Sequence, residues 1–160
     1  MIIAICGLLA MTVTAVALIR RYLTIVTVRG ESMTPTYRPG DRLLARRWGL
    51  HRLRRGDVVV LDGARIAGPR TPVPGDLVLN DRILKRVTAL PGDPVPYSRI
   101  DDRVADQQTV RVLPRHIVVL GDNPMLSADS RVFGPVDQDH VRAVVIRPLA
   151  TNLQPSPDRR

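Results

Sequence analysis

Two residues of this sequence have the chemical types of a nucleophile and its general base, Ser32 and Lys85. Lys85 is the only lysine of the chain, so the other 23 of its 24 Lys and Arg residues are arginine. Arginine keeps its charge in proteins, whereas a buried lysine can become neutral and accept a proton. Ser32 follows Gly30 at the end of a predicted strand, where its hydroxyl would be exposed beside backbone N–H groups. The alternatives are a surface lysine, whose stem lies on apolar atoms, and a solvated turn serine.

Lys85 lies in a segment with the alternation of a β-strand. Successive strand residues point to opposite faces, so Ile83, Lys85 and Val87 share one face. Burial between two β-branched neighbours would disfavour the ammonium form and lower the lysine pKa. The pattern therefore predicts a base that is usable near neutral pH.

A polar cluster follows another predicted strand and a Gly-Asp-Asn turn. It contains Ser127, Asp129 and Arg131. Asp129 and Arg131 can form a short-range ion pair, and Ser127 can hydrogen-bond a neutral lysine and orient its lone pair. We interpret this cluster as the support of the proposed base.

The elements that must position these residues are mostly short strands broken by Pro-Gly-Asp turns. No helical period of useful length appears after residue 21, so we expect one mainly β domain over residues 22–150 and a flexible tail over 151–160. Loops are expected at 62–80 and 94–108. Strands are predicted at Tyr22–Arg29, Asp41–Arg46, Asp57–Leu61, Arg82–Leu90, Thr109–Leu113, His116–Leu120 and His140–Arg147.

The N-terminal segment is uncharged from residue 2 to residue 19, and Arg20 and Arg21 end the run. Eighteen helical residues span about 27 Å, close to the hydrocarbon thickness of a bilayer. We therefore predict a transmembrane anchor over residues 1–21, with a cleaved signal peptide as the alternative. Because no basic residue precedes the run, the positive-inside rule by itself would place the following domain in the cytoplasm.

The composition argues against several other classes of protein. The net charge is +9, but aromatic residues make up only 3% and arginines are interleaved with aspartates, which disfavours nucleic-acid binding. Cys6 is the only cysteine, so an internal disulfide is impossible. His51, His116 and His140 are too scattered to suggest a metal site, and we expect no metal and no organic cofactor.

Four blocks of the sequence, in order, resemble the bacterial type I signal peptidases, which are membrane-anchored serine proteases of the S26 type with a Ser/Lys dyad. The resemblance covers about residues 25–146. Its blocks are Gly30-Glu-Ser32-Met-Thr-Pro-Thr36, Arg55-Gly-Asp-Val-Val59, Leu84-Lys-Arg-Val87 with Pro91-Gly-Asp93, and Gly121-Asp-Asn123 with Ser127-x-Asp-Ser-Arg131 and Phe133-Gly134.

This resemblance implies a mainly antiparallel β catalytic domain with Ser32 as nucleophile and Lys85 as general base. By the same resemblance Ser127 orients Lys85, Asp129 and Arg131 hold the site together, and Arg86 supports it. Gly30, Ser32 and Met33 would border the oxyanion site and substrate groove, with the Ser32 N–H as first oxyanion donor. The implied partners are the lipid bilayer and secretory preproteins, which would be cut after small residues.

The sequence also departs from the family pattern. Gly30 stands where some members carry a serine that helps bind the oxyanion, so the second oxyanion donor is left open. Pro124, Met125 and Leu126 replace the polar residues usual in the last block. The 94–115 region leaves little room for the accessory β domain of the family, so we expect a minimal form.

Three alternatives to a general leader peptidase are compatible with parts of the sequence. A dedicated maturation protease would serve one precursor, such as a metalloenzyme or a peptide. A self-cleaving repressor would need an N-terminal DNA-binding motif in place of the apolar run. A membrane-tethered binding protein on an inactive protease fold would be expected to lack a dyad residue. A leader peptidase should place its catalytic domain outside the cytoplasm, and we prefer this orientation to the one from Arg20 and Arg21.

Overall fold

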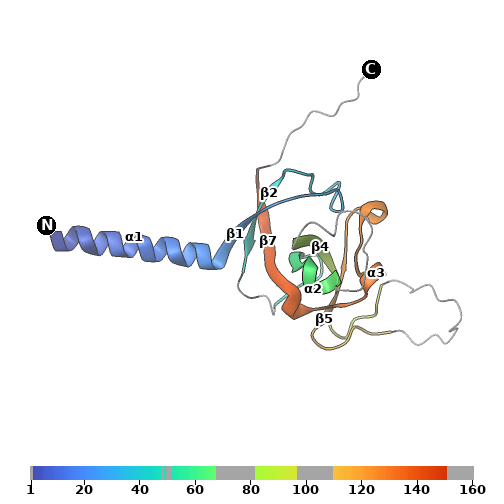
Figure 1. Ribbon diagram of the computed structural model, residues 1–160. Helices are drawn as coiled ribbons and strands as arrows, with labels where there is room; N and C mark the ends of the chain where they lie inside the picture. The colour runs from blue at the N-terminus through green and yellow to red at the C-terminus, as the bar shows by residue number, and fades with distance from the viewer. Residues whose placement is uncertain (1, 48, 50–51, 68–81, 97–109, 151–160) are drawn as a thin grey trace, which may run out of the picture.

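The computed structural model describes residues 2–47, 49, 52–67, 82–96 and 110–150 (Figure 1). A long N-terminal helix leads into a sheet that carries short helices at its connections. The elements are α1 Ile2–Tyr22, β1 Leu23–Thr27, β2 Arg42–Arg46, β3 Val58–Asp62, α2 Gly63–Ala67, β4 Arg82–Ala89, β5 His116–Leu120, η2 Pro124–Leu126, α3 Ser130–Phe133, β6 Val136–Asp137, η3 Gln138–His140 and β7 Val141–Ala150.

The strands form one antiparallel sheet in the order β1-β2-β7-β3-β4-β5-β6. The last strand of the chain, β7, therefore lies between β2 and β3 and joins the two halves of the sheet. This arrangement confirms the predicted mainly antiparallel β fold, and β5 has the same bounds as the predicted strand.

The core is built almost entirely from aliphatic side chains, as expected of a chain with few aromatic residues. Val59 and Leu61 of β3 pack with Val87 of β4 and with Ile117 and Val119 of β5. A smaller cluster of Ala45, Val60 and Ala143 lies on β2, β3 and β7, and Val26 of β1 packs against it. Burial of these side chains makes the sheet a rigid support for residues at its strand ends.

Three features differ from the sequence-based expectations. The predicted strand Thr109–Leu113 is reduced, among its described residues, to a single bridge between Arg111 and Pro94. The helices α2 and α3 were not predicted, because five and four residues are too few to establish a helical period. The two-residue strand β6 was missed for the same reason. Most of the two predicted loops, together with the predicted flexible tail, falls at 68–81, 97–109 and 151–160, outside the described residues.

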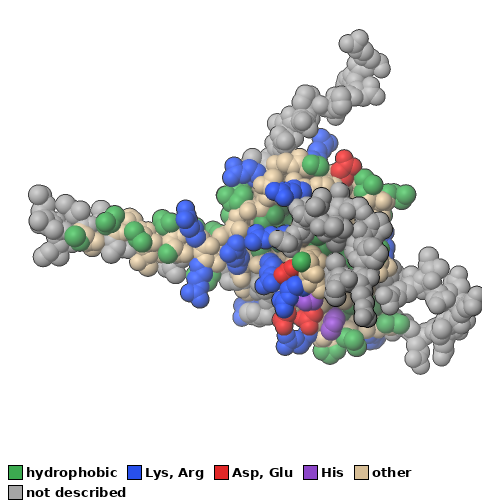
Figure 2. All heavy atoms as spheres, viewed as in Figure 1, with side chains coloured by type: hydrophobic (Ala, Val, Ile, Leu, Met, Phe, Trp, Pro, Cys, Tyr) green, Lys and Arg blue, Asp and Glu red, His purple; other side chains and the backbone are tan. Residues whose placement is uncertain are grey.

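The helix α1 projects from the sheet as a rod with exposed apolar side chains such as Leu9, Met11 and Val13 (Figure 2). In the part of the chain that the structure describes, no helix combines the length and the apolarity needed to cross a bilayer. The structure therefore supports a helix at the predicted position but does not confirm the predicted membrane span.

Candidate active site

Lys85 lies on the buried face of β4, as its alternating sequence predicts. The strand buries Ile83, Lys85 and Val87 in turn, and Lys85 pairs with Val59 of β3. Only 2% of the lysine remains exposed. Burial lowers the pKa of Lys85 to about 8, the negative charge of Asp129 partly opposes this change, and the positive charge of Arg131 adds to it. Lys85 therefore loses its proton far more readily than an exposed lysine, and about a tenth of the molecules carry it neutral at pH 7.

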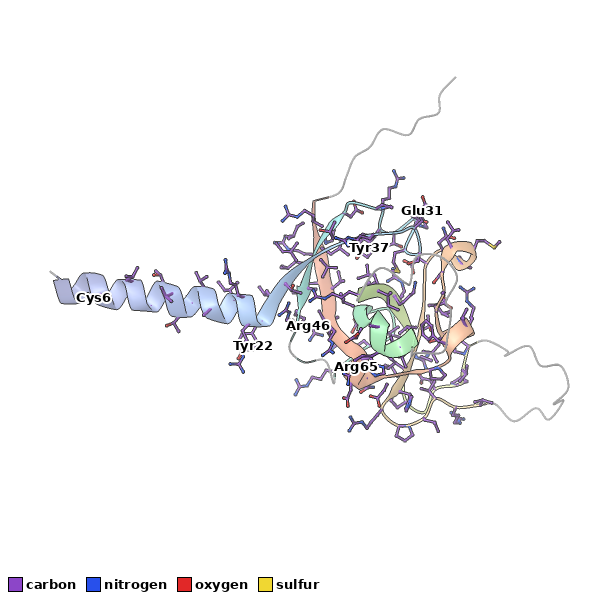
Figure 3. The ribbon with its side chains drawn as sticks, in the orientation of Figure 1. Cys6, Tyr22, Glu31, Tyr37, Arg46 and Arg65 are labelled. Atoms are coloured by element: carbon purple, nitrogen blue, oxygen red, sulfur yellow. The ribbon has the colours of Figure 1, made fainter. Side chains whose placement is uncertain are left out.

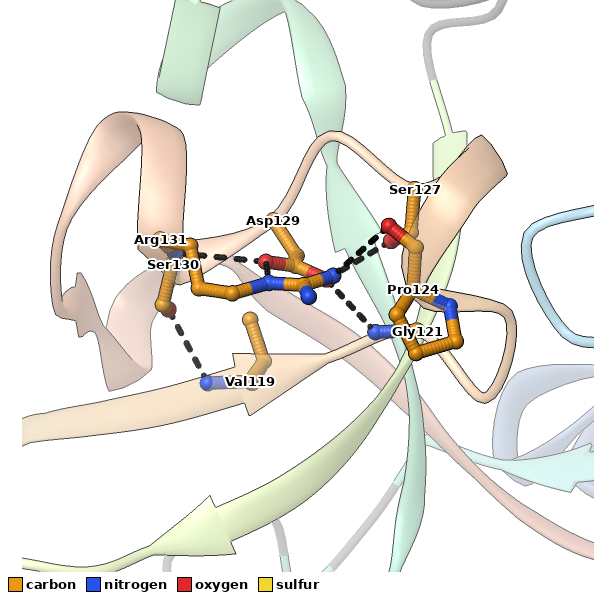
Figure 4. Close-up of polar contacts among 7 residues, drawn as sticks. All are labelled: Val119, Gly121, Pro124, Ser127, Asp129, Ser130 and Arg131. Atoms are coloured by element: carbon orange, nitrogen blue, oxygen red, sulfur yellow. Dashed lines mark hydrogen bonds and ion pairs between the residues drawn. The ribbon is translucent and has the colours of Figure 1, made fainter. Parts of the chain in front are cut away.

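Asp129 is the centre of the polar network beside this lysine (Figure 4). Its completely buried carboxylate accepts hydrogen bonds from Gly121 N (2.9 Å), Ser127 Oγ (2.8 Å) and the Arg131 guanidinium (Nε 2.9 Å and Nη2 2.8 Å). Burial opposes ionisation of Asp129, but the hydrogen bonds from Arg131, Gly121 and Ser127 outweigh it and hold its pKa below the usual value. Asp129 also caps α3 by accepting from Arg131 N.

Ser127 is held so that it can act as a hydrogen-bond acceptor. Its hydroxyl proton is donated to Asp129, which leaves the oxygen lone pairs to accept a hydrogen bond from another donor. A neutral lysine amine that donates to this oxygen would have its own lone pair directed elsewhere. The hydrogen bond to Asp129 leaves Ser127 able to accept from Lys85, but no hydrogen bond joins the two among the described residues, and the orienting role of Ser127 stays a prediction.

Gly121 brings the Ser32 and Ser127 segments into close contact. A β-carbon at residue 121 would lie 2.6 Å from the carbonyl oxygen of Ser32 and would collide with the side chain of Ser127. Only glycine leaves room for this approach of backbone to backbone. The nucleophile candidate and the Asp129 network therefore meet at the end of β5.

The turn that carries Ser32 is fixed by local and long-range hydrogen bonds. Gly30 enters the turn with a φ of 74°, a conformation that favours glycine. Asn123 donates its backbone N–H to Ser32 O (3.0 Å) and its side-chain amide to Thr34 Oγ1 (2.9 Å). Figure 3 labels Glu31 and Tyr37 on this part of the chain, at the side of the sheet opposite α1. The sequence identified Asn123 only as part of a motif and predicted no role for it, although its place close after β5 was a usable signal.

Arg86 lies on the opposite face of β4 and joins it to two turns. Its guanidinium binds both carboxylate oxygens of Asp122 (Nε 2.8 Å and Nη2 2.6 Å) and donates to Gly56 O (2.9 Å). Hydrogen bonding to Arg86 is the largest cause of the lowered pKa of Asp122. Arg86 therefore ties the turn before β3, the lysine strand and the Gly121–Asn123 turn to one another, and Asp122 is a second residue whose role the sequence reasoning missed.

Not every predicted contact is present. Among the described residues, no hydrogen bond joins Ser32 Oγ to Lys85 Nζ. Met33 is buried, so its side chain packs in the interior instead of lining an open groove as predicted. In contrast, Met125 and Leu126 of η2 are exposed close to the site. No cluster of His, Cys, Asp and Glu side chains suited to a metal ion is found in the described ranges.

We expect Asp129→Ala to destabilise the protein by about 3–5 kcal/mol, because Arg131, Ser127 and Gly121 N would lose a buried charged acceptor. Urea unfolding of the full chain measures this loss. The matched control is Asp139→Ala, which breaks the exposed ion pair to Arg115 and should cost at most about 1 kcal/mol. Equal losses in the two variants would contradict the central role of Asp129.

Comparison with known proteins identifies related chains. The family model described as "Signal peptidase, peptidase S26" matches residues 2–111 and 99–149. The mitochondrial ATP-independent inner membrane protease subunit 1b of Arabidopsis thaliana is 36% identical over 121 residues, which cover 73% of this chain and 64% of that protein. Signal peptidase IB of Staphylococcus aureus strain N315 is 28% identical over 150 residues, covering 72% of this chain and 71% of the relative. A crystal structure of a signal peptidase I from Enterococcus faecalis V583 aligns with a TM-score of 0.37 and 21% identity over 59% of this chain and 97% of that chain.

Proposed function

This chain belongs to the signal peptidase family, peptidase S26, a family of serine endopeptidases, and we propose that it removes leader peptides from exported preproteins with Ser32 as nucleophile and Lys85 as general base. The observation that carries this proposal is the environment of Lys85. A lysine that is 2% exposed, with a pKa of about 8, lies within electrostatic reach of Asp129 and Arg131. The same Asp129 holds Ser127 and Gly121, and Gly121 touches the Ser32 backbone.

The proposed reaction begins with proton transfer. Neutral Lys85 accepts the proton of Ser32 Oγ, which attacks the scissile carbonyl carbon and forms a tetrahedral oxyanion. Protonated Lys85 then gives its proton to the leaving amine as the C–N bond breaks, and an acyl-enzyme remains on Ser32. Lys85, neutral again, takes a proton from water, whose oxygen attacks the acyl carbon. The C–Oγ bond then breaks as Lys85 returns this proton to Ser32 Oγ, and the leader leaves with its new carboxyl group, which loses its remaining proton to solvent.

The oxyanion is assigned to the backbone N–H of Ser32. Gly30 has no side-chain donor, and its φ of 74° disfavours a serine there, so a side-chain donor from residue 30 has no part in the proposal. One backbone donor of this kind typically contributes about 100- to 1000-fold to the rate. An extended substrate segment would be positioned by strand-like backbone hydrogen bonds, and small residues before the bond would fit restricted pockets.

Mapping of new N-termini tests the proposed activity. Purified full chain is mixed with secretory preproteins, and mass spectrometry identifies the cleaved bonds. We expect cuts after small residues at the first and third positions before the bond. Cleavage at other bonds, or the same products from a Ser32→Ala preparation, would contradict the proposal.

Membrane attachment through residues 1–21, with the catalytic domain outside the cytoplasm, is part of the same proposal. It is supported by the uncharged run of residues 2–19 and by the exposed apolar side chains of α1. We expect the full chain to sediment with membranes and to resist extraction by high salt, whereas a chain without residues 2–19 should be largely soluble. An impermeant thiol reagent applied to a Thr36→Cys/Cys6→Ala variant reports the side of the membrane on which the domain lies. Labelling only after the cells are opened would exclude the secretory role but leave the chemistry intact.

A dedicated maturation protease is the second candidate. The observation that favours it is the exposed apolar η2, where Met125 and Leu126 offer a contact surface for one particular precursor close to Ser127. Cleavage of a single precursor in the N-terminus mapping would support this candidate, and cleavage of many unrelated leaders would exclude it.

A further inference from the structure

The positive charge of this protein is concentrated in its first third. Residues 1–56 contain ten arginines against two acids, a net charge of +8, while the whole chain carries +9. The remaining 104 residues are therefore almost balanced. A charge asymmetry of this size points to an anionic surface as a partner.

Arg42 of this first third shares one face of the sheet near α1 with Arg147 of the last strand. Residues that pair directly across neighbouring strands point to the same side of a sheet. The pairs Ile25–Leu44 and Leu44–Arg147 place one arginine in a row with two aliphatic side chains. Arg42, two residues from Leu44 on β2, points to the same side and is exposed, as is Arg147. We name Ile25, Leu44, Arg42 and Arg147 the basic face.

The basic face adjoins the end of α1. Leu23, the first residue of β1, follows Tyr22, the last residue of α1, and pairs with Arg46. Figure 3 shows Tyr22 and Arg46 close to the point where α1 meets the sheet, and Figure 2 shows basic side chains on both sides of the helix end. Arg20 and Arg21 in the last turn of α1 and Arg47 after β2 are exposed there.

Five exposed arginines of this region have no acidic partner in the described ranges. The ion pairs found there use Arg55, Arg86, Arg115, Arg131 and Arg142. Arg20, Arg21, Arg42, Arg47 and Arg147 are in none of them. Ile25 keeps 49% of its surface exposed, so the basic face combines cationic groups with an accessible apolar side chain.

We propose that the basic face, with Arg20, Arg21 and Arg47, binds the headgroups of anionic phospholipids and holds the sheet against the bilayer surface. This inference rests on the proposed membrane attachment of α1, because that attachment brings β1 and β2 to the lipid interface. Guanidinium groups bind phosphate oxygens in bidentate geometry, and an exposed isoleucine among them fits the boundary between headgroups and acyl chains. A single-stranded nucleic acid would instead be expected to meet stacking aromatic side chains, and none of the four described residues of the basic face is aromatic.

Native mass spectrometry of the full chain in a non-ionic detergent tests the proposal. The protein is mixed with equal amounts of phosphatidylglycerol and phosphatidylcholine, and the ratio of the two retained lipids is measured. We expect phosphatidylglycerol to be preferred at least about threefold, since each arginine near an anionic surface adds to the attraction. The double variant Arg42→Gln/Arg147→Gln should reduce this preference at least about twofold, while Arg20, Arg21 and Arg47 retain the remainder.

The matched control is Arg111→Gln/Arg115→Gln, which removes the same charge beside β5, near the opposite edge of the sheet. It should keep the wild-type lipid ratio. A wild-type ratio of one would overturn the proposal, and so would an equal loss in both double variants, which would indicate a response to net charge alone. Retention of neither lipid would also overturn it and would contradict membrane attachment. Cleavage of a soluble leader peptide in the same detergent is measured separately. Loss of cleavage with the lipid preference retained would contradict the proposed protease activity alone, and the reverse result would contradict the lipid site alone.

Discussion

Ser32→Ala is expected to reduce kcat/KM for a leader-peptide substrate by about 10⁴-fold or more, while leaving the fold unchanged. Removal of the nucleophile from a serine protease abolishes the covalent pathway and leaves only the contribution of substrate binding and oxyanion stabilisation. The Ser32 side chain makes no hydrogen bond to another described residue, so its loss should cost little stability. Steady-state cleavage of a fluorogenic leader peptide measures the rate, and urea unfolding measures stability.

The matched control for this variant is Thr27→Ala. Thr27 is an exposed hydroxyl residue at the end of β1, a few residues before Ser32 on the same stretch of chain. It should retain full activity. A Ser32→Ala protein that is folded and cleaves at the wild-type rate would remove Ser32 from the mechanism.

Lys85→Arg should lower kcat/KM by about 10²–10⁴-fold, the usual contribution of a general base. Arginine preserves the positive charge beside Asp129 but cannot lose its proton, so the variant separates a base from an electrostatic support. Because Lys85 is buried, the larger guanidinium of Lys85→Arg could also disturb packing. A Lys85→Met variant has a side chain of similar length without the guanidinium, so it separates loss of the amine from loss of packing. Both variants should show a loss of kcat/KM in this range if the amine lone pair is required, and a Lys85→Arg protein that is folded and keeps the wild-type rate would exclude Lys85 as the base.

The pH dependence of the wild-type protein gives an independent measurement of the same group. Burial lowers the pKa of Lys85 to about 8, so the neutral, active form increases as the pH rises through 8. The value of kcat/KM should therefore increase tenfold per pH unit well below 8 and level off above it, until another group titrates. A flat profile between pH 6 and pH 9 would contradict a lysine base with this pKa.

Much of this protein can be predicted from local sequence patterns. Alternation in residues 82–89 predicted both the strand and the buried face of Lys85, and β5 was predicted with its correct bounds. The order of the four motif blocks predicted the family and the candidate site residues. The predictions of the strand, of its buried face and of the family succeed because the side-chain period of a strand and the motif blocks are contained in short segments. The Ser32/Lys85 dyad itself, and the roles of its supporting residues, stay predictions for the experiments above.

The tertiary structure alone decided how the segments meet. β7 lies between β2 and β3 because strand pairing depends on burial of both faces, which no single segment specifies. Asn123 binds Thr34 across 89 positions of sequence, and Arg86 binds Asp122 across 36, so neither partner could be read from its own neighbourhood. Gly121 matters because a β-carbon would strike Ser127 and the Ser32 carbonyl. The sequence by itself determined which residues could perform the chemistry. Only the packed sheet determined that Lys85 is desolvated, because desolvation depends on all the neighbouring atoms that exclude water from a side chain.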